Sequence, residues 1–212
     1  MRSHFIWRRK MAKIIIMQGM TCLGKSTLCE RLADEIPKCK HYSLDIYKEN
    51  MWDKFGFDSV AQREHQSELA RQLYYSEIAE DIRVNRYDYY LLDYVFSEKY
   101  WAELQENLNG WELPVKTIYL HPADLETHSK VWHERSRDFS VRHPGHGATH
   151  YHDGVGSDYV NKYAGKVLTS LPVTNTSLDI AVSFNPYNLS MPFKEIVQFV
   201  TATPKLRTIS FK

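Results

Sequence analysis

The chain has 212 residues, of which 43% are hydrophobic and 25% are charged, and its formal net charge at pH 7 is +1. This composition is typical of a folded globular domain and excludes collagen-like and intrinsically disordered chains. A net charge near zero also excludes an overall positive electrostatic potential that would attract a nucleic-acid backbone or an anionic membrane. Any recognition of anions therefore has to be local.

The beginning of the chain and the cysteine content set expectations for domain organisation and location. Residues 1–10 are basic but lack the apolar stretch of a signal peptide, and no apolar run reaches the roughly 20 residues of a membrane helix. We expect residues 1–10 to be a flexible basic extension and residues 11–212 to be one domain. Three cysteines do not make a disulfide framework, which favours a cytoplasmic protein without membrane contact. A homodimer is an open alternative to a monomer.

The first predicted elements are a strand, a glycine-containing loop and a helix. Residues 13–18 form a short apolar run that ends at a glycine, which is typical of a strand buried on both faces. Residues 26–36 carry apolar side chains at every fourth position, which predicts a helix that Pro37 stops. This order places the loop at the carboxyl end of the strand.

Strands and helices continue to alternate in the middle of the chain. We predict a strand over residues 41–44, a helix over 59–84, a strand over 89–96 and a helix over 97–108 that ends at the turn Asn109-Gly110. The apolar side of the helix over 59–84 would consist of Leu69, Leu73, Ile78 and Ile82.

The remaining elements complete an α/β domain. They are strands over residues 115–120 and 177–183, a helix that opens at Pro122 and runs toward Arg135, and a closing helix over 192–200. Strands that alternate with helices indicate βαβ units with right-handed crossovers. The prediction is a three-layer domain with a mainly parallel five-stranded sheet and helices on both faces.

The loop after the first strand carries the most specific motif. Residues 19–26 match G-x-x-x-x-G-K-S/T, the phosphate-binding loop, and the flanking strand and helix disfavour a chance glycine turn. Its backbone N–H groups and the following helix would bind phosphates, Lys25 would reach the β- and γ-phosphates, and the Ser26 hydroxyl would ligate Mg²⁺. The candidate nucleotide-binding residues are Gly19, Met20, Thr21, Cys22, Leu23, Gly24, Lys25, Ser26 and Thr27.

Residues 13–36 resemble the opening of the P-loop kinases of small molecules, the superfamily of nucleoside, nucleotide and shikimate kinases. The resemblance implies the P-loop NTPase fold, ATP and Mg²⁺ as cofactors, and transfer of the γ-phosphoryl group to a hydroxyl or phosphate of a small molecule. It also implies that Asp45, after the second strand, is the catalytic base that takes the proton of the acceptor hydroxyl. The alternative for Asp45 is a helix N-cap.

Asp93 ends the third predicted strand, where P-loop proteins usually carry the acidic residue of the Mg²⁺ shell. The alternative is a buried, hydrogen-bonded structural aspartate. Residues 93–100 loosely resemble the acidic-Arg-Ser segment of deoxynucleoside and thymidylate kinases, but Tyr94 stands where those families have an arginine. A nucleoside or nucleotide kinase is therefore an alternative that Tyr94 disfavours.

Residues 122–138 resemble the helix that leads into the lid of these kinases and ends in closely spaced arginines. Arg135, Arg137 and Arg142 are the candidates for stabilising charge on the transferred phosphoryl group, in a lid over residues 135–156. A solvated basic turn is the alternative for each arginine.

The lid sequence is rich in glycine and histidine, and its place is similar to that of the lid in chloramphenicol phosphotransferase and zeta-toxin-like kinases. A zinc site made of its four histidines is disfavoured, because no cysteine lies near them and their spacing matches no pattern of paired ligands. Polar loop residues or substrate contacts are the preferred interpretation.

The prediction is an ATP-dependent kinase with a small-molecule phosphoryl acceptor. A polynucleotide 5′-hydroxyl kinase is disfavoured by the balanced charge, and a nucleotide-dependent switch by the lack of an Asn-Lys-x-Asp stretch after a strand. We expect residues 51–72 and the lid to form the acceptor pocket, where Trp52, Phe55 and Phe57 would favour a flat or apolar acceptor.

Overall fold

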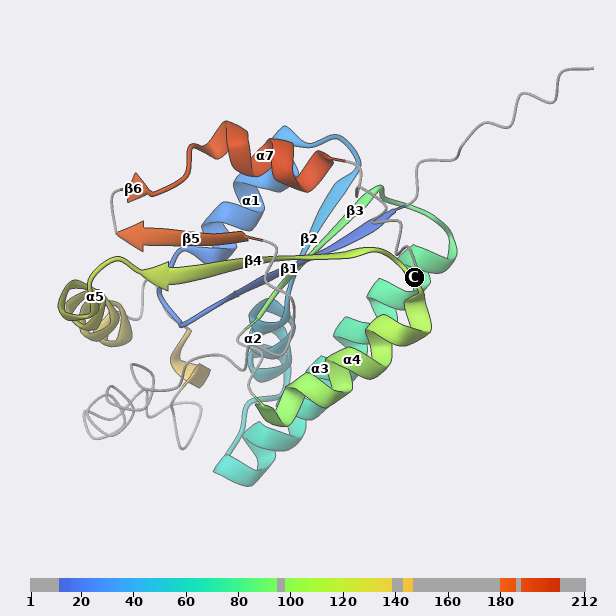
Figure 1. Ribbon diagram of the computed structural model, residues 1–212. Coiled ribbons are helices and arrows are strands. Elements are labelled where there is room, and N and C mark those ends of the chain that lie inside the picture. Colours follow the sequence, from blue (N-terminus) through green and yellow to red (C-terminus); the bar gives the residue numbers. More distant parts are fainter. Residues whose placement is uncertain (1–11, 95–97, 139–142, 147–179, 186–187, 203–212) are drawn as a thin grey trace, which may run out of the picture.

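The computed structural model describes residues 12–94, 98–138, 143–146, 180–185 and 188–202 (Figure 1). In these residues six strands form one sheet in the order β2-β3-β1-β4-β5-β6. The strands are β1 (Lys13–Gly19), β2 (Cys39–Ser43), β3 (Tyr89–Asp93), β4 (Val115–Pro122), β5 (Ile180–Asn185) and β6 (Asn188–Leu189). The first five are parallel, and the two-residue β6 is antiparallel to β5. The predicted α/β class with five parallel strands is confirmed.

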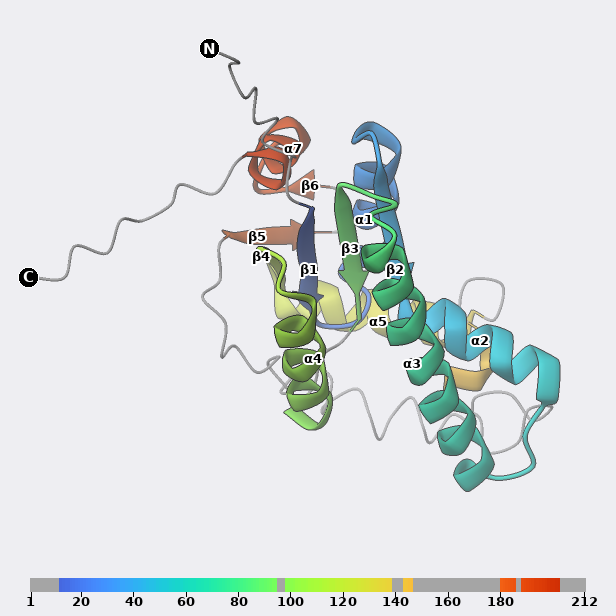
Figure 2. The same cartoon turned by 90° about the vertical axis from the view of Figure 1, so that its right-hand side faces the viewer.

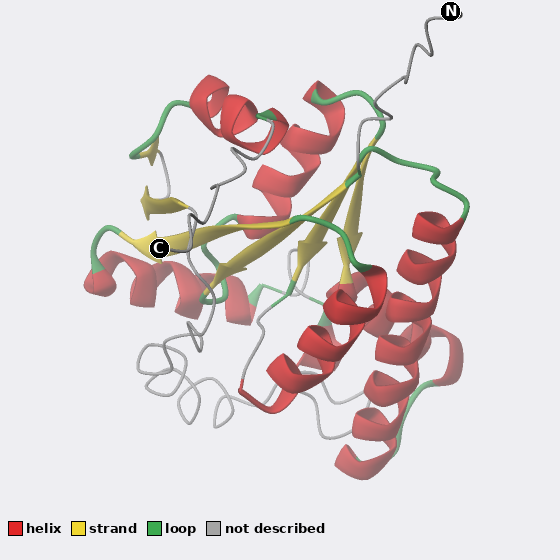
Figure 3. Cartoon of the chain, turned by 45° about the vertical axis from the view of Figure 1, so that its right-hand side comes forward, coloured by secondary structure: helices red, strands yellow, loops and turns green. Residues whose placement is uncertain are grey.

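Helices lie on both faces of the sheet, so the three-layer prediction is also confirmed. They are α1 (Lys25–Glu35), α2 (Leu44–Phe55), α3 (Val60–Arg83), α4 (Glu98–Trp111), α5 (Leu125–Arg137) and α7 (Phe193–Thr201). Figure 1 shows α1 and α7 on one side of the sheet, and α3 and α4 on the other. Figure 3 shows the strands running between two groups of helices, and Figure 2 shows α7 above β1 and α4 below it.

The alternation of side chains along β1 explains why both faces of the sheet are covered. Successive strand residues point to opposite faces. Ile15 and Met17 are buried with residues of α1 and α7, whereas Ile14 and Ile16 are buried with residues of α3 and α4. Because both sets are apolar, β1 is stable only between two helical layers, and burial of each such side chain contributes about 1.5–3 kcal/mol.

The helices α3 and α4 differ from their predicted form. On the predicted apolar side of α3, Ile78 is buried and Ile82 packs against the same core, as expected. Leu73 is 53% exposed instead, and Tyr74 and Tyr75 are buried next to it. The α4 helix continues through Asn109-Gly110 to Trp111, so the expected turn there is wrong.

The start of α5 is also corrected by the structure. Pro122 is the last residue of β4 rather than the first residue of the helix. The helix begins at Leu125 because the Asp124 carboxylate accepts hydrogen bonds from the backbone N–H groups of Glu126 and Thr127, the latter at 2.7 Å. The second strand likewise spans Cys39–Ser43 rather than residues 41–44, and Leu44 already belongs to α2.

Several expectations fall outside the described residues. They concern the extension over residues 1–10, Arg142 and most of the predicted lid, of which the structure describes residues 135–138 and the single turn Pro144–His146. Within the described residues, none of the helices combines the length and hydropathy needed to cross a membrane. Cys22, Cys29 and Cys39 are free thiols, as expected.

A glycine is required at position 19, at the carboxyl end of the central strand β1, because β4 packs closely against it there. Its φ is +143°, and a Cβ atom there would overlap the carbonyl oxygen of Leu120 on β4. We expect Gly19→Ala to lower the free energy of unfolding by about 2 kcal/mol or more, because strain and a backbone displacement add. Chemical denaturation measures this change.

The matched control for this substitution is Gly110→Ala. Gly110 lies inside α4 with no atom near the position of an added Cβ. Alanine should therefore stabilise the protein by up to about 1 kcal/mol through helix propensity. Equal stability of Gly19→Ala and the unmodified chain would contradict the close packing of β1 on β4.

Candidate active site

The phosphate-binding loop joins β1 to α1 through two residues with left-handed backbone conformations. Cys22 and Gly24 have positive φ values of 61° and 69°, which places both in the left-handed region. This conformation is free for glycine but costs a cysteine about 1–2 kcal/mol, a cost that the surrounding structure has to offset. The loop therefore ends at the amino-terminal end of α1, where backbone N–H groups and the helix dipole attract anions.

A pocket of about 160 Å³ opens above this loop. It is lined by Thr21, Cys22, Gly24, Lys25, Ser26, Thr27, Asp45, Asp93, Tyr94, Arg135 and His146. Three of the predicted nucleotide-binding residues, Gly19, Met20 and Leu23, do not line it. The side chains of Met20 and Leu23 belong to the core shared with α1. Their side chains therefore anchor the loop.

Lys25 is positioned at the pocket by the loop itself. Its ammonium group donates a hydrogen bond to the carbonyl oxygen of Met20 at 2.8 Å, and the residue is largely buried. The carbonyl is a neutral acceptor, and a phosphate oxygen is a stronger partner for an ammonium group because the bond is charge-assisted. The lysine is thus held within reach of an anion at the loop.

Ser26 and Asp93, the two predicted Mg²⁺ ligands, are brought together although they are far apart in the sequence. The Ser26 hydroxyl donates a 2.6 Å hydrogen bond to Oδ2 of the buried Asp93. This contact arises because β1 and β3 are parallel neighbours whose register pairs Met17 with Asp93. A carboxylate and a hydroxyl oxygen at one pocket edge are hard donors, so the residues fit a Mg²⁺ ion.

Asp45 lies on the same pocket, in the first turn of α2. The N-cap position of α2 is Ser43, and no side chain caps this helix by a hydrogen bond, so the N-cap interpretation of Asp45 is wrong. The Asp45 side chain is 53% exposed, and Nζ of Lys48 lies 3.6 Å from its Oδ1. Its role as catalytic base stays a prediction that this position allows.

Lys48 and Tyr94 form a pair beside Asp45. The Lys48 ammonium donates a 2.8 Å hydrogen bond to the Tyr94 hydroxyl and lies 4.2 Å from the centre of its ring. Burial lowers the pKa of Lys48 and raises the pKa of Tyr94. Tyr94 occupies the position where the resemblance implies an arginine, and here the positive charge next to it comes from α2.

The described parts of the predicted lid reach the pocket at two points. Arg135 is exposed and lines the pocket, while the side chain of Arg137 and all of Arg142 lie outside the described residues. His146 also lines the pocket, and its Nε2 lies 2.8 Å from a carboxylate oxygen of Glu49. Two of the lid histidines therefore contact α2, since His143 lies 2.9 Å from Asp53.

The aromatic residues of the expected acceptor pocket do not line the cavity above the loop. Trp52 and Phe57 are buried in a small cluster of their own, and Phe55 is 60% exposed. The ring of Trp52 lies against Gly145, between His143 and His146. Trp52 thus packs the Pro144–His146 turn against α2, and the expectation of a flat or apolar acceptor has no support from these three aromatic residues.

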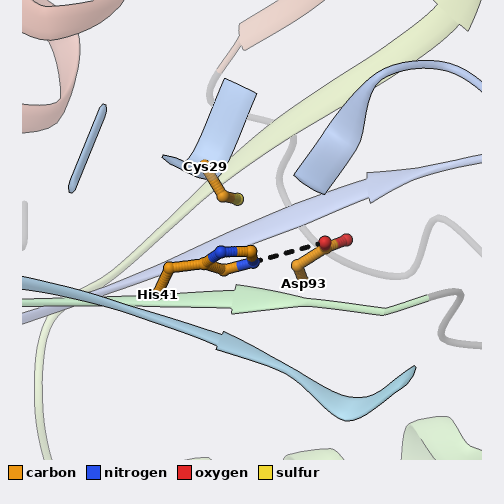
Figure 4. A group of neighbouring side chains, drawn as sticks. All are labelled: Cys29, His41 and Asp93. Carbon is orange, nitrogen blue, oxygen red and sulfur yellow. Dashed lines mark hydrogen bonds and ion pairs between the residues drawn. The ribbon is translucent and has the colours of Figure 1, made fainter. Parts of the chain in front are cut away.

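Three residues with contacts at the site were not predicted from the sequence. His41 Nε2 lies 3.3 Å from Asp93 Oδ2, and Cys29 is buried next to this pair (Figure 4). His128, buried on α5, places Nε2 2.8 Å from the backbone carbonyl of Thr21 and so supports the loop from the side. None of the three belongs to a local motif, because each reaches the site from a different element.

The comparisons with known proteins show the fold. No family model and no curated protein matches the sequence. A protein of Chloroflexus aurantiacus provisionally assigned as a kinase has a similar structure, with a TM-score of 0.67 and 20% identity over 90% of this chain and 97% of that chain. The structure of APE1195 gives a TM-score of 0.52 and 14% identity over 90% and 93% of the two chains. The chain therefore shares the α/β fold of these two structures, with a phosphate-binding loop after its first strand.

Proposed function

We propose that this chain is an ATP-dependent kinase that transfers the γ-phosphoryl group to a hydroxyl, or a phosphate, of a small molecule. The observation that carries the proposal is the shared pocket in which Lys25, Ser26 and Asp93 meet Asp45 from α2. The loop is sufficient for binding a nucleotide. Phosphoryl transfer also needs a group that orients the acceptor. An accessible carboxylate facing the loop is such a group.

The loop side of the pocket would bind the phosphates of ATP. Backbone N–H groups at the start of α1 and the Lys25 ammonium offset the negative charge that builds on the β- and γ-phosphates. Ser26 and Asp93 would hold Mg²⁺, which neutralises phosphate charge when it is bound. Arg135 is exposed and lines the same pocket, so its guanidinium group would approach the transferred phosphoryl group.

The α2 side of the pocket would bind the acceptor. An Asp45 oxygen accepts the hydrogen bond of the acceptor hydroxyl and takes its proton as the new P–O bond forms. The bond between the γ-phosphorus and the bridging oxygen breaks, and its electron pair leaves with ADP. Lys48, next to Asp45, orients the carboxylate in this process.

A screen for acceptor-dependent ADP formation tests the proposal. The purified chain is incubated with ATP and Mg²⁺ and with sugars, nucleosides, nucleotides, hydroxylated antibiotics or a short oligonucleotide with a free 5′-hydroxyl. We expect one class of small molecule to raise ADP formation well above the acceptor-free rate, with a phosphorylated product found by mass spectrometry.

The control is the same screen with Asp45→Asn, which should lose the acceptor-dependent rate and keep nucleotide binding. Hydrolysis that is equal with every compound, and equal in the variant, would contradict a kinase and favour a nucleotide-dependent switch. Phosphorylation of the oligonucleotide alone would assign the polynucleotide kinase instead.

A further inference from the structure

Cys29, His41 and Asp93 form a cluster of three potential metal ligands under the phosphate-binding loop (Figure 4). One ligand atom from each residue lies within 4.8 Å of the other two. Cys29 lies three residues after Ser26 on α1, so both face the same side of the helix. His41 comes from β2 and Asp93 from the end of β3. Three separate elements thus direct their donor atoms to one point.

The register of the sheet explains why His41 and Asp93 meet. The pairing of β2 with β3 sets His41 opposite Leu91 and Ser43 opposite Asp93. Residues two apart in a strand share a face, so His41 and Asp93 are diagonal neighbours on one side of the sheet. Leu91 is buried in the core that includes α1, which identifies this side as the one that carries Cys29.

We propose that Cys29, His41 and Asp93 form a zinc site. Sulfur and imidazole nitrogen are donors that Zn²⁺ prefers and that Mg²⁺ avoids, so the cluster is chemically distinct from the Mg²⁺ position at Ser26 and Asp93. Three protein ligands leave the fourth tetrahedral position for a water molecule, which corresponds to the open class of zinc sites.

The distances agree with this assignment. A tetrahedral zinc ion with bonds of about 2.0–2.1 Å holds its nitrogen and oxygen ligands about 3.3 Å apart. His41 Nε2 and Asp93 Oδ2 are 3.3 Å apart. The corresponding sulfur-to-nitrogen distance is about 3.6 Å. The three donor atoms lie within 4.8 Å of one another, so binding would draw the Cys29 sulfur closer to the other two atoms.

The charges also balance when zinc binds. Cysteine binds zinc as the thiolate, so metal binding releases the proton of the Cys29 thiol. On binding, the S–H bond breaks, the Sγ–Zn bond forms, the proton passes to solvent, and no electrons are exchanged. The thiolate and the Asp93 carboxylate then neutralise the two charges of the ion in a buried place.

Zinc at this site would act on the proposed kinase through Asp93. The carboxylate that ligates zinc is the one that accepts the Ser26 hydrogen bond and would hold Mg²⁺. Zinc and Mg²⁺-ATP should therefore compete, and zinc should raise the apparent Kd of Mg²⁺-ATP with increasing concentration. This consequence rests on the proposed function, whereas the metal site does not.

The site is tested on the full chain, stripped of metal and without nucleotide, by titration with Co²⁺ as a spectroscopic substitute for zinc. We expect a thiolate-to-Co²⁺ charge-transfer band that Zn²⁺ removes by displacement. Cys29→Ser should abolish the band. His41→Gln should weaken metal binding by more than about 100-fold, because loss of even an outer-shell partner costs about 10- to 100-fold.

The matched control is Cys39→Ser, which removes a half-buried thiol from the same strand as His41 and should keep the band. Melting temperatures without metal show whether each variant is folded. Cys29→Ala repeats the test without the buried hydroxyl group that Cys29→Ser introduces. A wild-type chain without the band, or a band that persists in both Cys29 variants, would overturn the zinc site. Failure of Mg²⁺-ATP to bind would instead reject the proposed function and leave the Co²⁺ spectrum valid.

Discussion

Replacing Lys25 with alanine is expected to reduce phosphoryl transfer by about 10³-fold or more, since the ammonium offsets charge that develops on the β- and γ-phosphates. Backbone amides at the start of α1 stay in place, so weak nucleotide binding should remain. The fold should also persist, because the structure gives Lys25 one hydrogen bond, to Met20, whose loss costs about 1 kcal/mol. Steady-state kinetics and circular dichroism measure both effects.

Two further variants sharpen this test. Lys25→Met keeps the length of the aliphatic stem without the charge and should be as inactive as the alanine variant. Lys130→Ala removes an exposed lysine whose partner is Glu126 on the same helix, and it should leave the activity unchanged. Wild-type turnover in both Lys25 variants would exclude the loop as the catalytic nucleotide site.

Asp45→Asn is expected to lower kcat by about 10²- to 10⁴-fold, the range for loss of a general base, while the affinity for ATP changes little. The amide keeps the size of the carboxylate, and Asp45 does not cap α2. The stability should therefore change by no more than about 1 kcal/mol, through the helix dipole and the loss of the ion pair between the half-exposed Asp45 and Lys48. Comparison of kcat with the Kd of ATP separates the chemical step from nucleotide binding.

Asp58→Asn is the control for this change, because Asp58 is an exposed aspartate just beyond α2 that does not line the pocket. It should have wild-type kinetics. If Asp45→Asn kept full kcat and only the free energy of unfolding fell, Asp45 would be a structural carboxylate of the first turn, and another group would orient the acceptor.

The sequence was sufficient for the features that depend on neighbouring residues. The apolar run of β1, the glycine loop and the start of α1 are contiguous, so their pattern predicts both the strand–loop–helix unit and its phosphate chemistry. Alternating strands and helices predicted the parallel sheet for the same reason. Element ends were predicted less well, since α4 continues through Asn109-Gly110 to Trp111 and α5 begins after Asp124 rather than at Pro122.

By itself, the sequence determined that the chain is an α/β domain with a phosphate-binding loop, since a buried strand and a loop motif are encoded locally. Only the tertiary structure decided which side chains meet at that loop. Ser26 and His41 share one oxygen of Asp93 because three strands lie in a particular register. Cys29 joins them because α1 covers the same face. Contacts between distant segments depend on strand order and register, which no local pattern of residues records.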